Sequence, residues 1–478
     1  MEGRENRFIA MPLAFTGMGI FRVWTETVYS NSMITFPTQH DTPFGFTAFN
    51  LMAAVILILL ALNAKRVSPL YNKKWVYVVT AATMVASTCL NFLSYYIPEC
   101  AAYVGLIAAL SGAVGISFII LLWSELFGCL NPLRVGLYFS GGLIVGALIL
   151  WLFKGLAVPW LWVCTCLIPP LSLYCLERAY KLLPAEERPR LGLLQQPVPW
   201  KPIAIVALYS FAYGMCESVF GSVLGIHSGL GCVFAAAVVY AAICYKRDNL
   251  QLALTYRAAC ILAIISLIPF GSFMPFGDSI SSFCALASYT FVLIAIMVVL
   301  SNLTYQYGFN AVWLFGIERA VRLVSVEAGA GMHKLITLPD WPPVLDNVLI
   351  SIIVAAMVVI ATKFFLSEKQ LTTPWGIVLK DIVGKEPEDS RARIGAKVNE
   401  ISDEYGLTAR ESEILLLLAL GKKPAQIERE LYVAASTIKT HVKHIYQKLD
   451  VHSREEMFEM LGITENTGAD SGPDPFAL

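Results

Sequence analysis

Residues 436–449 read STIKTHVKHIYQKL, a stretch with the pattern of an amphipathic helix. At about 100° per residue, its apolar side chains fall within one narrow stripe. That stripe consists of Ile438, Val442, Ile445 and Leu449. The opposite arc is polar and consists of Ser436, Lys439, Thr440, Lys443 and Gln447. The pattern predicts a helix that packs through its stripe, while the Lys-bearing arc is either a solvated face or a face that enters the DNA major groove.

Two shorter helices are predicted just before this stretch. Thr408 and Glu411 have the Thr-x-x-Glu spacing of a capping box, and the apolar run 414–420 follows them. Gly421 suits the end of that helix. A second short helix then carries Ile427 and Leu431, and a turn at 433–435 leads into the long helix.

The whole segment 407–462 resembles the LuxR/NarL type of helix-turn-helix domain. The resemblance rests on Leu407-Thr408, Arg410-Glu411, Gly421, Ile427, Leu431, Thr437-Ile438-Lys439, His441-Val442, Lys448-Leu449 and Arg454. It implies a four-helix domain that binds double-stranded DNA and forms a homodimer through its last helix, between Ser453 and Leu461. By position it implies base-edge and phosphate contacts from Lys439, Thr440 and Lys443, a phosphate contact from Thr437, and Gln447 on the same face. His441, at the edge of the stripe, is expected to be a packed structural histidine.

Two residues depart from the family pattern. Ala434 stands where a Ser usually caps the long helix, a loss of about 1 kcal/mol unless Ser436 substitutes for it. Glu428 replaces a small residue that packs against the turn. The segment is also not strongly basic, so we expect modest affinity from one copy and compensation by dimerisation on a two-part site.

The rest of the chain has the composition of a membrane protein. Hydrophobic residues make up 57% and charged residues 15%, with a mean hydropathy of +0.64, whereas about 25% of a soluble domain is charged. We predict twelve membrane-spanning helices of adequate length. They run approximately 8–30, 44–62, 75–96, 101–123, 133–153, 156–175, 202–222, 225–245, 253–270, 280–302, 309–331 and 344–366. The first is not a cleavable signal, because it is long and contains Arg22 and Glu26.

The loops between these spans differ in charge. Lys and Arg lie in the loop at 63–74, in the long loop after the sixth span and in the loop after the eighth. The alternate loops 31–43, 97–100 and 271–279 contain neither residue. The positive-inside rule then places the N-terminus in the cytoplasm of a bacterial cell, and an even number of crossings of the inner membrane returns the C-terminus there.

The long loop at 176–201 contains Pro184, Pro189, Pro197 and Pro199 and divides the spans six and six. This layout resembles the major facilitator superfamily, whose halves are related by an axis along the membrane normal. The loop after the second span lacks the Gly-x-x-x-Asp pattern of many such transporters, which argues against transport but not against the fold. The expected fold is therefore all-α. It comprises a twelve-helix bundle at 1–366, a cytoplasmic linker at 367–406, the helix-turn-helix domain at 407–464 and a disordered tail at 465–478.

Charged residues inside the spans are candidates for a ligand site, because a charge facing lipid is costly. Glu26 in the first span and Glu217 in the seventh occupy corresponding depths, and Arg22 lies one turn before Glu26. Trp24 and Tyr213 are the candidate stacking walls. A polar pocket and an interhelical salt bridge of Arg22 both fit this pattern. Arg319 and Arg322 either serve an anionic ligand or extend to the cytoplasmic surface, and we favour the surface.

No pattern indicates an enzyme. The eleven cysteines all precede residue 285, the histidines are dispersed, and no metal-ligand, nucleophile or nucleotide motif is found. We therefore expect no catalytic residue, metal or cofactor. The sequence favours a membrane-embedded one-component transcriptional regulator that senses a small-molecule inducer. The alternatives are a transporter that also regulates, and a domain that has lost DNA binding and serves protein contacts.

Overall fold

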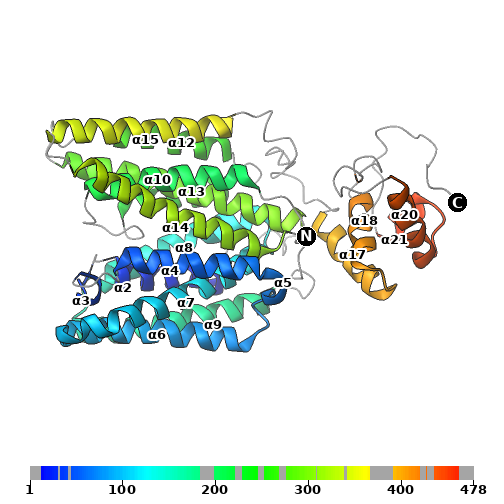
Figure 1. Ribbon diagram of the computed structural model, residues 1–478, viewed down its shortest axis with the longest axis horizontal. Coiled ribbons are helices and arrows are strands. Elements are labelled where there is room, and N and C mark those ends of the chain that lie inside the picture. The colour runs from blue at the N-terminus through cyan, green and yellow to red at the C-terminus, as the bar shows by residue number, and fades with distance from the viewer. Residues whose placement is uncertain are drawn as a thin grey trace. The chain divides into compact units, whose positions relative to one another are not determined.

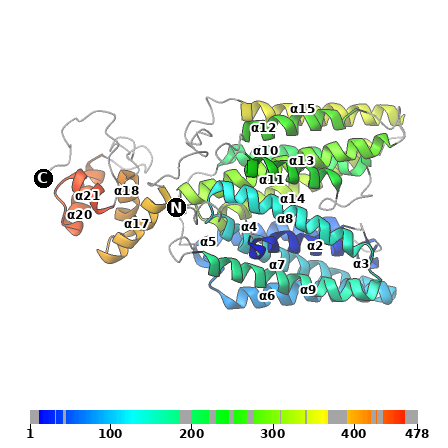
Figure 2. The same ribbon diagram turned by 180° about the vertical axis from the view of Figure 1, so that it is seen from behind.

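The computed structural model describes residues 12–30, 33–40, 45–183, 199–220, 229–245, 252–268, 276–307, 309–338, 342–366, 391–419, 427 and 435–461. Within these ranges the chain is helical and contains no β-sheet. It forms two compact units, one of residues 1–304 and 309–385 and the other of residues 305–308 and 386–478. Figure 1 and Figure 2 show the helices of both units from opposite sides.

A helix overlaps each predicted span of the first unit. In chain order these are α2 (Gly17–Tyr29), α4 (Phe46–Leu62), α6 (Lys74–Tyr96), α7 (Ala101–Phe127), α8 (Pro132–Phe153), α9 (Val158–Leu182), α10 (Trp200–Phe220), α11 (Leu230–Tyr245), α12 (Leu252–Ser266), α13 (Gly277–Tyr307), α14 (Ala311–Ile336) and α15 (Pro343–Leu366). Short helical turns flank them: η2 (Leu13–Thr16), α3 (Pro37–His40), α5 (Ala64–Val67) and η3 (Pro98–Cys100).

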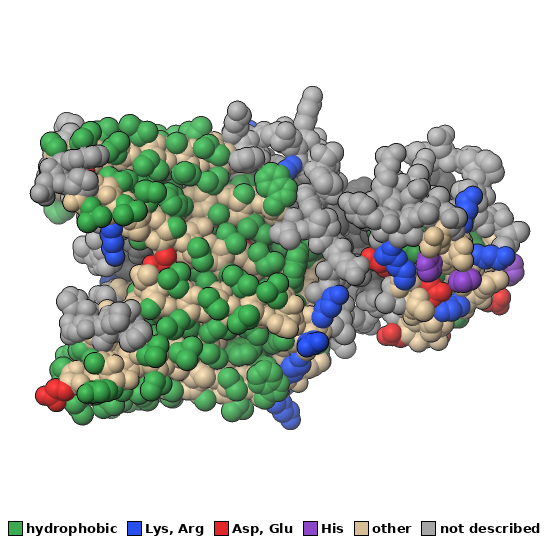
Figure 3. Space-filling model, in the orientation of Figure 1, with side chains coloured by type: hydrophobic (Ala, Val, Ile, Leu, Met, Phe, Trp, Pro, Cys, Tyr) green, Lys and Arg blue, Asp and Glu red, His purple; other side chains and the backbone are tan. Residues whose placement is uncertain are grey.

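The outer surface of these helices is apolar. Leu62 and Leu152 are 73% and 72% exposed, and Trp160 on α9 is 66% exposed. Figure 3 shows hydrophobic side chains over most of the visible face of this unit, with Lys and Arg mainly near one end. In the described part of the chain, five helices are long and apolar enough to cross a bilayer: Lys74–Tyr96, Pro98–Phe127, Pro132–Phe153, Val158–Leu182 and Ser279–Tyr305. Such a surface is unfavourable in water, so the unit is a membrane domain; the number of crossings stays a prediction.

Helix packing repeats between the first part of this unit, α2–α9, and the second part, α10–α15. Helix α2 packs on α8 and α9 as α10 packs on α14 and α15, and α6 packs on α9 as α12 packs on α15. Between the two parts, α4 packs on α14 and α8 packs on α11. In this correspondence α4 is the counterpart of α11, and α8 is the counterpart of α14. The contact α4–α14 of one arrangement therefore becomes the contact α11–α8 when the two parts are exchanged. Several helix contacts of the first part therefore have a counterpart in the second.

Glycines allow the equivalent pairs α2–α8 and α10–α14 to approach closely, and Figure 2 shows α2 beside α8. A Cβ on Gly19 of α2 would lie 1.8 Å from the carbonyl oxygen of Gly142 on α8. On α14, a Cβ on Gly329 would lie 2.1 Å from the carbonyl oxygen of Phe211 on α10. Small residues at the contact are what packing in a bilayer requires, because no hydrophobic effect drives helices together there.

Several polar groups inside the bundle are paired with one another. The Trp24 indole N–H donates to Thr88 Oγ1 at 2.8 Å. The Glu125 carboxylate at the end of α7 accepts the backbone N–H groups of Leu70 and Tyr71 at 2.9 and 3.1 Å. Because Leu70 and Tyr71 belong to the loop that joins α5 to α6, Glu125 attaches that loop to the end of the bundle.

The second unit contains α17 (Arg391–Glu404), α18 (Ala409–Ala419), α20 (Ala435–Leu449) and α21 (Arg454–Met460). The predicted capping box forms at the start of α18. Thr408 N–H donates to Glu411 Oε2 at 2.8 Å, and Glu411 N–H donates to Thr408 Oγ1 at 3.3 Å. Lys448 near the end of α20 donates to the same carboxylate at 2.8 Å and to the Gly406 carbonyl at 3.1 Å. One buried carboxylate thereby caps α18 and ties it to α20.

The contact between α10 and α14 provides a matched test of the bundle. Gly329→Ala is expected to lower the thermal midpoint of the detergent-solubilised chain, because the methyl group forces apart two backbones at a cost of about 1–3 kcal/mol. Gly331→Ala lies two residues further along α14, where a Cβ meets nothing within 4 Å. That control is expected to leave the midpoint unchanged or raise it, since Ala favours helix over Gly by about 1 kcal/mol. Equal effects of the two substitutions would contradict the close contact.

Glu411 makes the second unit sensitive to acid. Burial by itself raises the pKa of this carboxyl, but hydrogen bonds from Lys448 and Thr408 and the charge of Lys448 lower it to about 2 from an ordinary 4.5. Because the folded pKa is depressed, the stabilisation is complete above pH 4.5 and is lost as the pH falls toward 2. Allowing for the partly exposed Lys448, it amounts to about 2 kcal/mol.

Urea unfolding of a fragment of residues 391–478, followed by circular dichroism, measures this contribution. Glu411→Gln is expected to lower the free energy of unfolding at pH 7 and to remove its fall between pH 4.5 and 2. Glu413→Gln is the control, since it removes only a partly exposed ion pair of 2.7 Å with Arg410, a change of about 0.5 kcal/mol or less. An acid-dependent stability that survives in Glu411→Gln would show that another group is responsible.

Candidate nucleic-acid interface and buried charged residues

The apolar stripe of α20 is buried in the second unit. Ile438 and Ile445 are fully buried, and Val442 and Leu449 are at most 2% exposed. Tyr446, which the stripe did not include, is also buried at 2%. Burial of this side fixes which way the opposite side of α20 faces.

All five predicted DNA-binding residues lie on the exposed side of α20. They are Thr437, Lys439, Thr440, Lys443 and Gln447. His444 is also exposed, and its Nδ1 lies 4.0 Å from Glu411 Oε1; the sequence interpretation did not include it. The helix therefore offers two Lys side chains and several hydrogen-bonding groups to solvent, a surface suited to phosphates and base edges. Their contact with DNA stays a prediction.

Several residues of the predicted turn lie outside the described residues: Gly421, Glu428, Leu431 and Ala434, together with the side chain of Ser436. Ile427, between them, is fully buried as the second short helix requires. His441 is partly buried, and its Nδ1 has no hydrogen-bond partner among the described residues. This position at the margin of the core agrees with a packed side chain.

The last helix, α21, has one buried and one exposed side. Ser453 caps it by accepting the Glu456 N–H at 3.1 Å, while Met457, Phe458 and Leu461 are buried within the unit. The exposed side presents Glu456 and Glu459. Any dimer contact between Ser453 and Leu461 would use that exposed side.

Helix α17 belongs to the same unit, although the sequence interpretation assigned residues 391–405 to the linker. Val398 and Ile401 are 1% and 2% exposed, and α17 packs on α18. The compact unit therefore begins before the capping box.

In the bundle, the tentative ligand-binding residues of the first span have different surroundings. Arg22 is 5% exposed, with its guanidinium 4.9 Å from the centre of the Phe139 ring on α8. Glu26 is 1% exposed. Trp24 is fully buried against Tyr29 and Phe49, with its N–H bound to Thr88. The surroundings of Trp24 are thus those of a packed core residue.

The tentative residues of the seventh span lie on α10. The Tyr213 ring stacks on Tyr289 of α13, with centroids 4.3 Å apart. The Glu217 side chain lies outside the described residues.

The preferred interpretation of Arg322 as an exposed side chain at the end of its helix is wrong. Helix α14 continues to Ile336, so Arg322 lies in its middle and is 6% exposed. Arg322 Nε lies 3.3 Å from Glu318 Oε1, one turn earlier on the same helix. The Nε atom of Arg319 is also buried. A buried ion pair therefore stands in the second part of the bundle.

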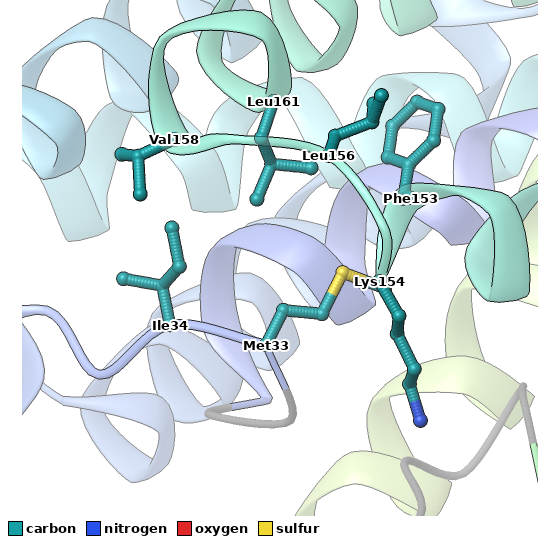
Figure 4. Close-up of a pocket in the computed structure, with 7 residues that line it drawn as sticks. All are labelled: Met33, Ile34, Phe153, Lys154, Leu156, Val158 and Leu161. Atoms are coloured by element: carbon teal, nitrogen blue, oxygen red, sulfur yellow. The ribbon is translucent and has the colours of Figure 1, made fainter.

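A separate hollow of about 210 Å³ lies where α8 joins α9 (Figure 4). Its lining is Met33, Ile34, Phe153, Lys154, Leu156, Val158 and Leu161. Figure 4 shows the Lys154 side chain extending away from the apolar residues. None of the predicted site residues lines this hollow.

Comparisons with known proteins found two kinds of similarity. The bundle is similar to the human organic anion transporter MFSD10, with a TM-score of 0.47 and 16% identity over 67% of this chain and 80% of that one. This likeness is too weak to support an argument.

Residues 395–461 match the family described as bacterial regulatory proteins, luxR family. Curated relatives include the transcriptional regulatory protein YvfU of Bacillus subtilis, 45% identical over 12% of this chain and 29% of its own length. NarL of Mycobacterium tuberculosis is 52% identical over 10% of this chain and 22% of its own length. MalT of Yersinia pestis is 47% identical over 13% of this chain and 7% of its own length. The chain spans less than a third of the length of these relatives. Residues 395–461 are therefore a LuxR-family DNA-binding domain, which this chain carries after a helical membrane domain.

Proposed function

We propose that this protein is a membrane-embedded, one-component transcriptional regulator. The proposal rests on the presence of two parts in one chain. One is a helical bundle with an apolar surface, and the other is a LuxR-family domain whose helix α20 exposes Lys439 and Lys443. The bundle binds a small-molecule inducer, and the domain binds a promoter. The protein lies in the inner membrane of a bacterial cell with both termini in the cytoplasm, as the Lys and Arg of alternate loops indicate.

The repeated helix packing supports a transporter-like architecture for the bundle. Equivalent contacts such as α2–α8 and α10–α14, with the cross-contacts α4–α14 and α8–α11, are what a 6+6 arrangement about an axis along the membrane normal produces. A major-facilitator-like fold with twelve crossings accounts for them. A bundle of this kind has two arrangements available to it, because its halves can tilt against each other.

Helix α20 is the element that enters the major groove. Lys439, Thr440 and Lys443 contact base edges and phosphates, Thr437 contacts phosphate, and Gln447 lies at the end of the same face. A homodimer formed through α21 places two copies on a two-part site. Binding of two linked copies raises the affinity for DNA and so compensates for the small basic charge of each copy.

Regulation requires that the inducer bind the two arrangements of the bundle with different affinity. A ligand with equal affinity for both shifts nothing, whereas a hundredfold preference shifts the equilibrium by about 2.7 kcal/mol. The bundle's two arrangements then differ in how they hold the DNA-binding domains of a dimer. The consequence is a change in operator occupancy.

The alternative is a major-facilitator-type transporter with an appended regulatory domain. The twofold packing of the bundle is compatible with it. The two functions differ in a direct observable, which is whether the inducer accumulates across the membrane.

Lys443→Ala is expected to weaken operator binding by about 1–3 kcal/mol, because a charge-assisted contact to DNA is lost. The measurement is a gel-shift series with the full detergent-solubilised chain and promoter DNA from beside its gene. Lys397→Ala is the control, since that Lys forms a solvent-exposed ion pair of 3.2 Å with Glu400 on α17. If both variants bind like the wild type, α20 does not present Lys443 to DNA.

Reporter expression from the same promoter is expected to respond to an inducer, while the radiolabelled inducer does not accumulate in membrane vesicles. A pure sensor only needs to bind, so uptake is not required of it. Uptake abolished by Glu26→Gln but retained by Glu177→Gln, an exposed residue at the end of α9, would favour the transporter. Full reporter output that ignores every inducer would argue against sensing.

A further inference from the structure

Two cysteine side chains meet where α6 packs on α9 in the first part of the bundle. The Sγ atom of Cys89 on α6 lies 3.9 Å from the Sγ atom of Cys166 on α9, the distance of a sulfur hydrogen bond in which either thiol can donate. Both residues are free cysteines. They are 77 residues apart in the sequence, so helix packing brings them together and no local pattern indicates the pair.

Aromatic contacts beside the thiols hold the two helices at this position. One turn from the pair, the Phe92 ring of α6 stacks on the Trp162 ring of α9, with centroids 5.7 Å apart and planes at 5°. Tyr96, a further turn along α6, also meets Trp162, at 5.9 Å. The two helices run in opposite directions, since Cys89 faces Cys166 while the later Phe92 faces the earlier Trp162. Two packed helices therefore fix the separation of the sulfur atoms.

The pair is close enough to form a disulfide without separating or re-pairing the helices. The sulfur atoms of a disulfide are about 2.05 Å apart, so the 3.9 Å between Cys89 and Cys166 has to shorten by a shift of about 1 Å in each sulfur. This shift is small beside the distance that Sγ moves between two rotamers. Cys164 is also half-buried on α9, but two residues rotate the helix by about 200°, so it lies on another side.

The thiol pair borders the surface that the bundle presents to lipid. Helices α6 and α9 are both long and apolar enough to cross a bilayer, and both thiols are half-buried. On α9, Val163 and Leu167 near Cys166 are 53% and 60% exposed, and Ala86 is exposed one turn before Cys89 on α6. Hydrocarbon excludes charged reagents such as glutathione, and the reactive thiolate is disfavoured in apolar surroundings. A reaction partner for this pair has to dissolve in the bilayer, and the reaction is expected to be slow.

We propose that Cys89 and Cys166 form a reversible disulfide whose oxidant is a lipid-soluble quinone. Two S–H bonds break and one S–S bond forms, and the two electrons and two protons that are released reduce the quinone to its hydroquinone. A neutral dithiol reverses the step by becoming a disulfide itself. The inference goes beyond the proposed function, because it gives the bundle a redox-sensitive link between α6 and α9 that requires neither an inducer nor DNA.

Oxidation of the full detergent-solubilised chain by duroquinone tests the proposal. The reduced protein is incubated with duroquinone for several hours in the absence of oxygen and unfolded, and its remaining thiols are alkylated with N-ethylmaleimide. Mass spectrometry of the intact chain is expected to show the loss of two of the eleven alkylated cysteines. Peptide mapping is expected to find Cys89 joined to Cys166 within one chain, and dithiothreitol is expected to restore all the thiols. Eleven alkylated cysteines after quinone treatment, or a disulfide that lacks either residue, overturn the proposal.

Matched variants show which thiols react. Cys89→Ser and Cys166→Ser are each expected to abolish the loss of thiols, because the remaining sulfur has no partner. Cys164→Ser is the control on the same helix and is expected to oxidise like the wild type. Thiol loss that persists in Cys89→Ser and Cys166→Ser would assign the reaction to other cysteines and contradict the pair.

A charged oxidant tests the approach from lipid. Tetrathionate is a water-soluble dianion, so at equal concentration it is expected to oxidise the pair at least tenfold more slowly than duroquinone does. Equal rates would contradict oxidation from the lipid side. These assays contain neither DNA nor inducer, so their failure would remove the redox link and leave the proposed regulatory function as it stands.

Discussion

Every polar group inside the bundle has to find its partner within the protein, because the medium around helices such as α6 and α9 is hydrocarbon. The pairs Trp24–Thr88 and Glu125–Leu70 satisfy this constraint with ordinary hydrogen bonds. Arg322 satisfies it only in part, since its Nε lies 3.3 Å from Glu318 Oε1 while its Nη2 is buried without a hydrogen-bond partner among the described residues.

The DNA-binding domain obeys the opposite constraint, because its exterior is water. Its small core depends on a stripe of apolar residues on α20 and on one carboxylate, Glu411, that caps α18 and holds Lys448 of α20. With these groups engaged inside the domain, Lys439 and Lys443 are left on the exposed side of α20. The orientation of the recognition surface is thus a consequence of how the core is packed.

Local patterns were sufficient to predict the elements, but not the partners of the charged residues. The spacing of Thr408 and Glu411 predicted their reciprocal hydrogen bonds, and the period of Ile438 to Leu449 predicted the buried side of α20. The position of Arg322 could not be predicted, because its depth depends on where α14 ends, which is set by tertiary packing. The aromatic surroundings of Trp24 and the packing of α17 on α18 could not be predicted either. Both depend on contacts with other helices, which leave no periodic pattern in the sequence of one helix.

Regulation by DNA binding requires the DNA-binding domain to lie in the compartment that holds the chromosome. A green fluorescent protein and an alkaline phosphatase, each fused after Leu478 in separate strains, measure this directly, because the first fluoresces only when folded in the cytoplasm and the second is active only outside it. We predict fluorescence without phosphatase activity. Phosphatase activity without fluorescence would place the domain outside the cell and contradict regulation by DNA binding.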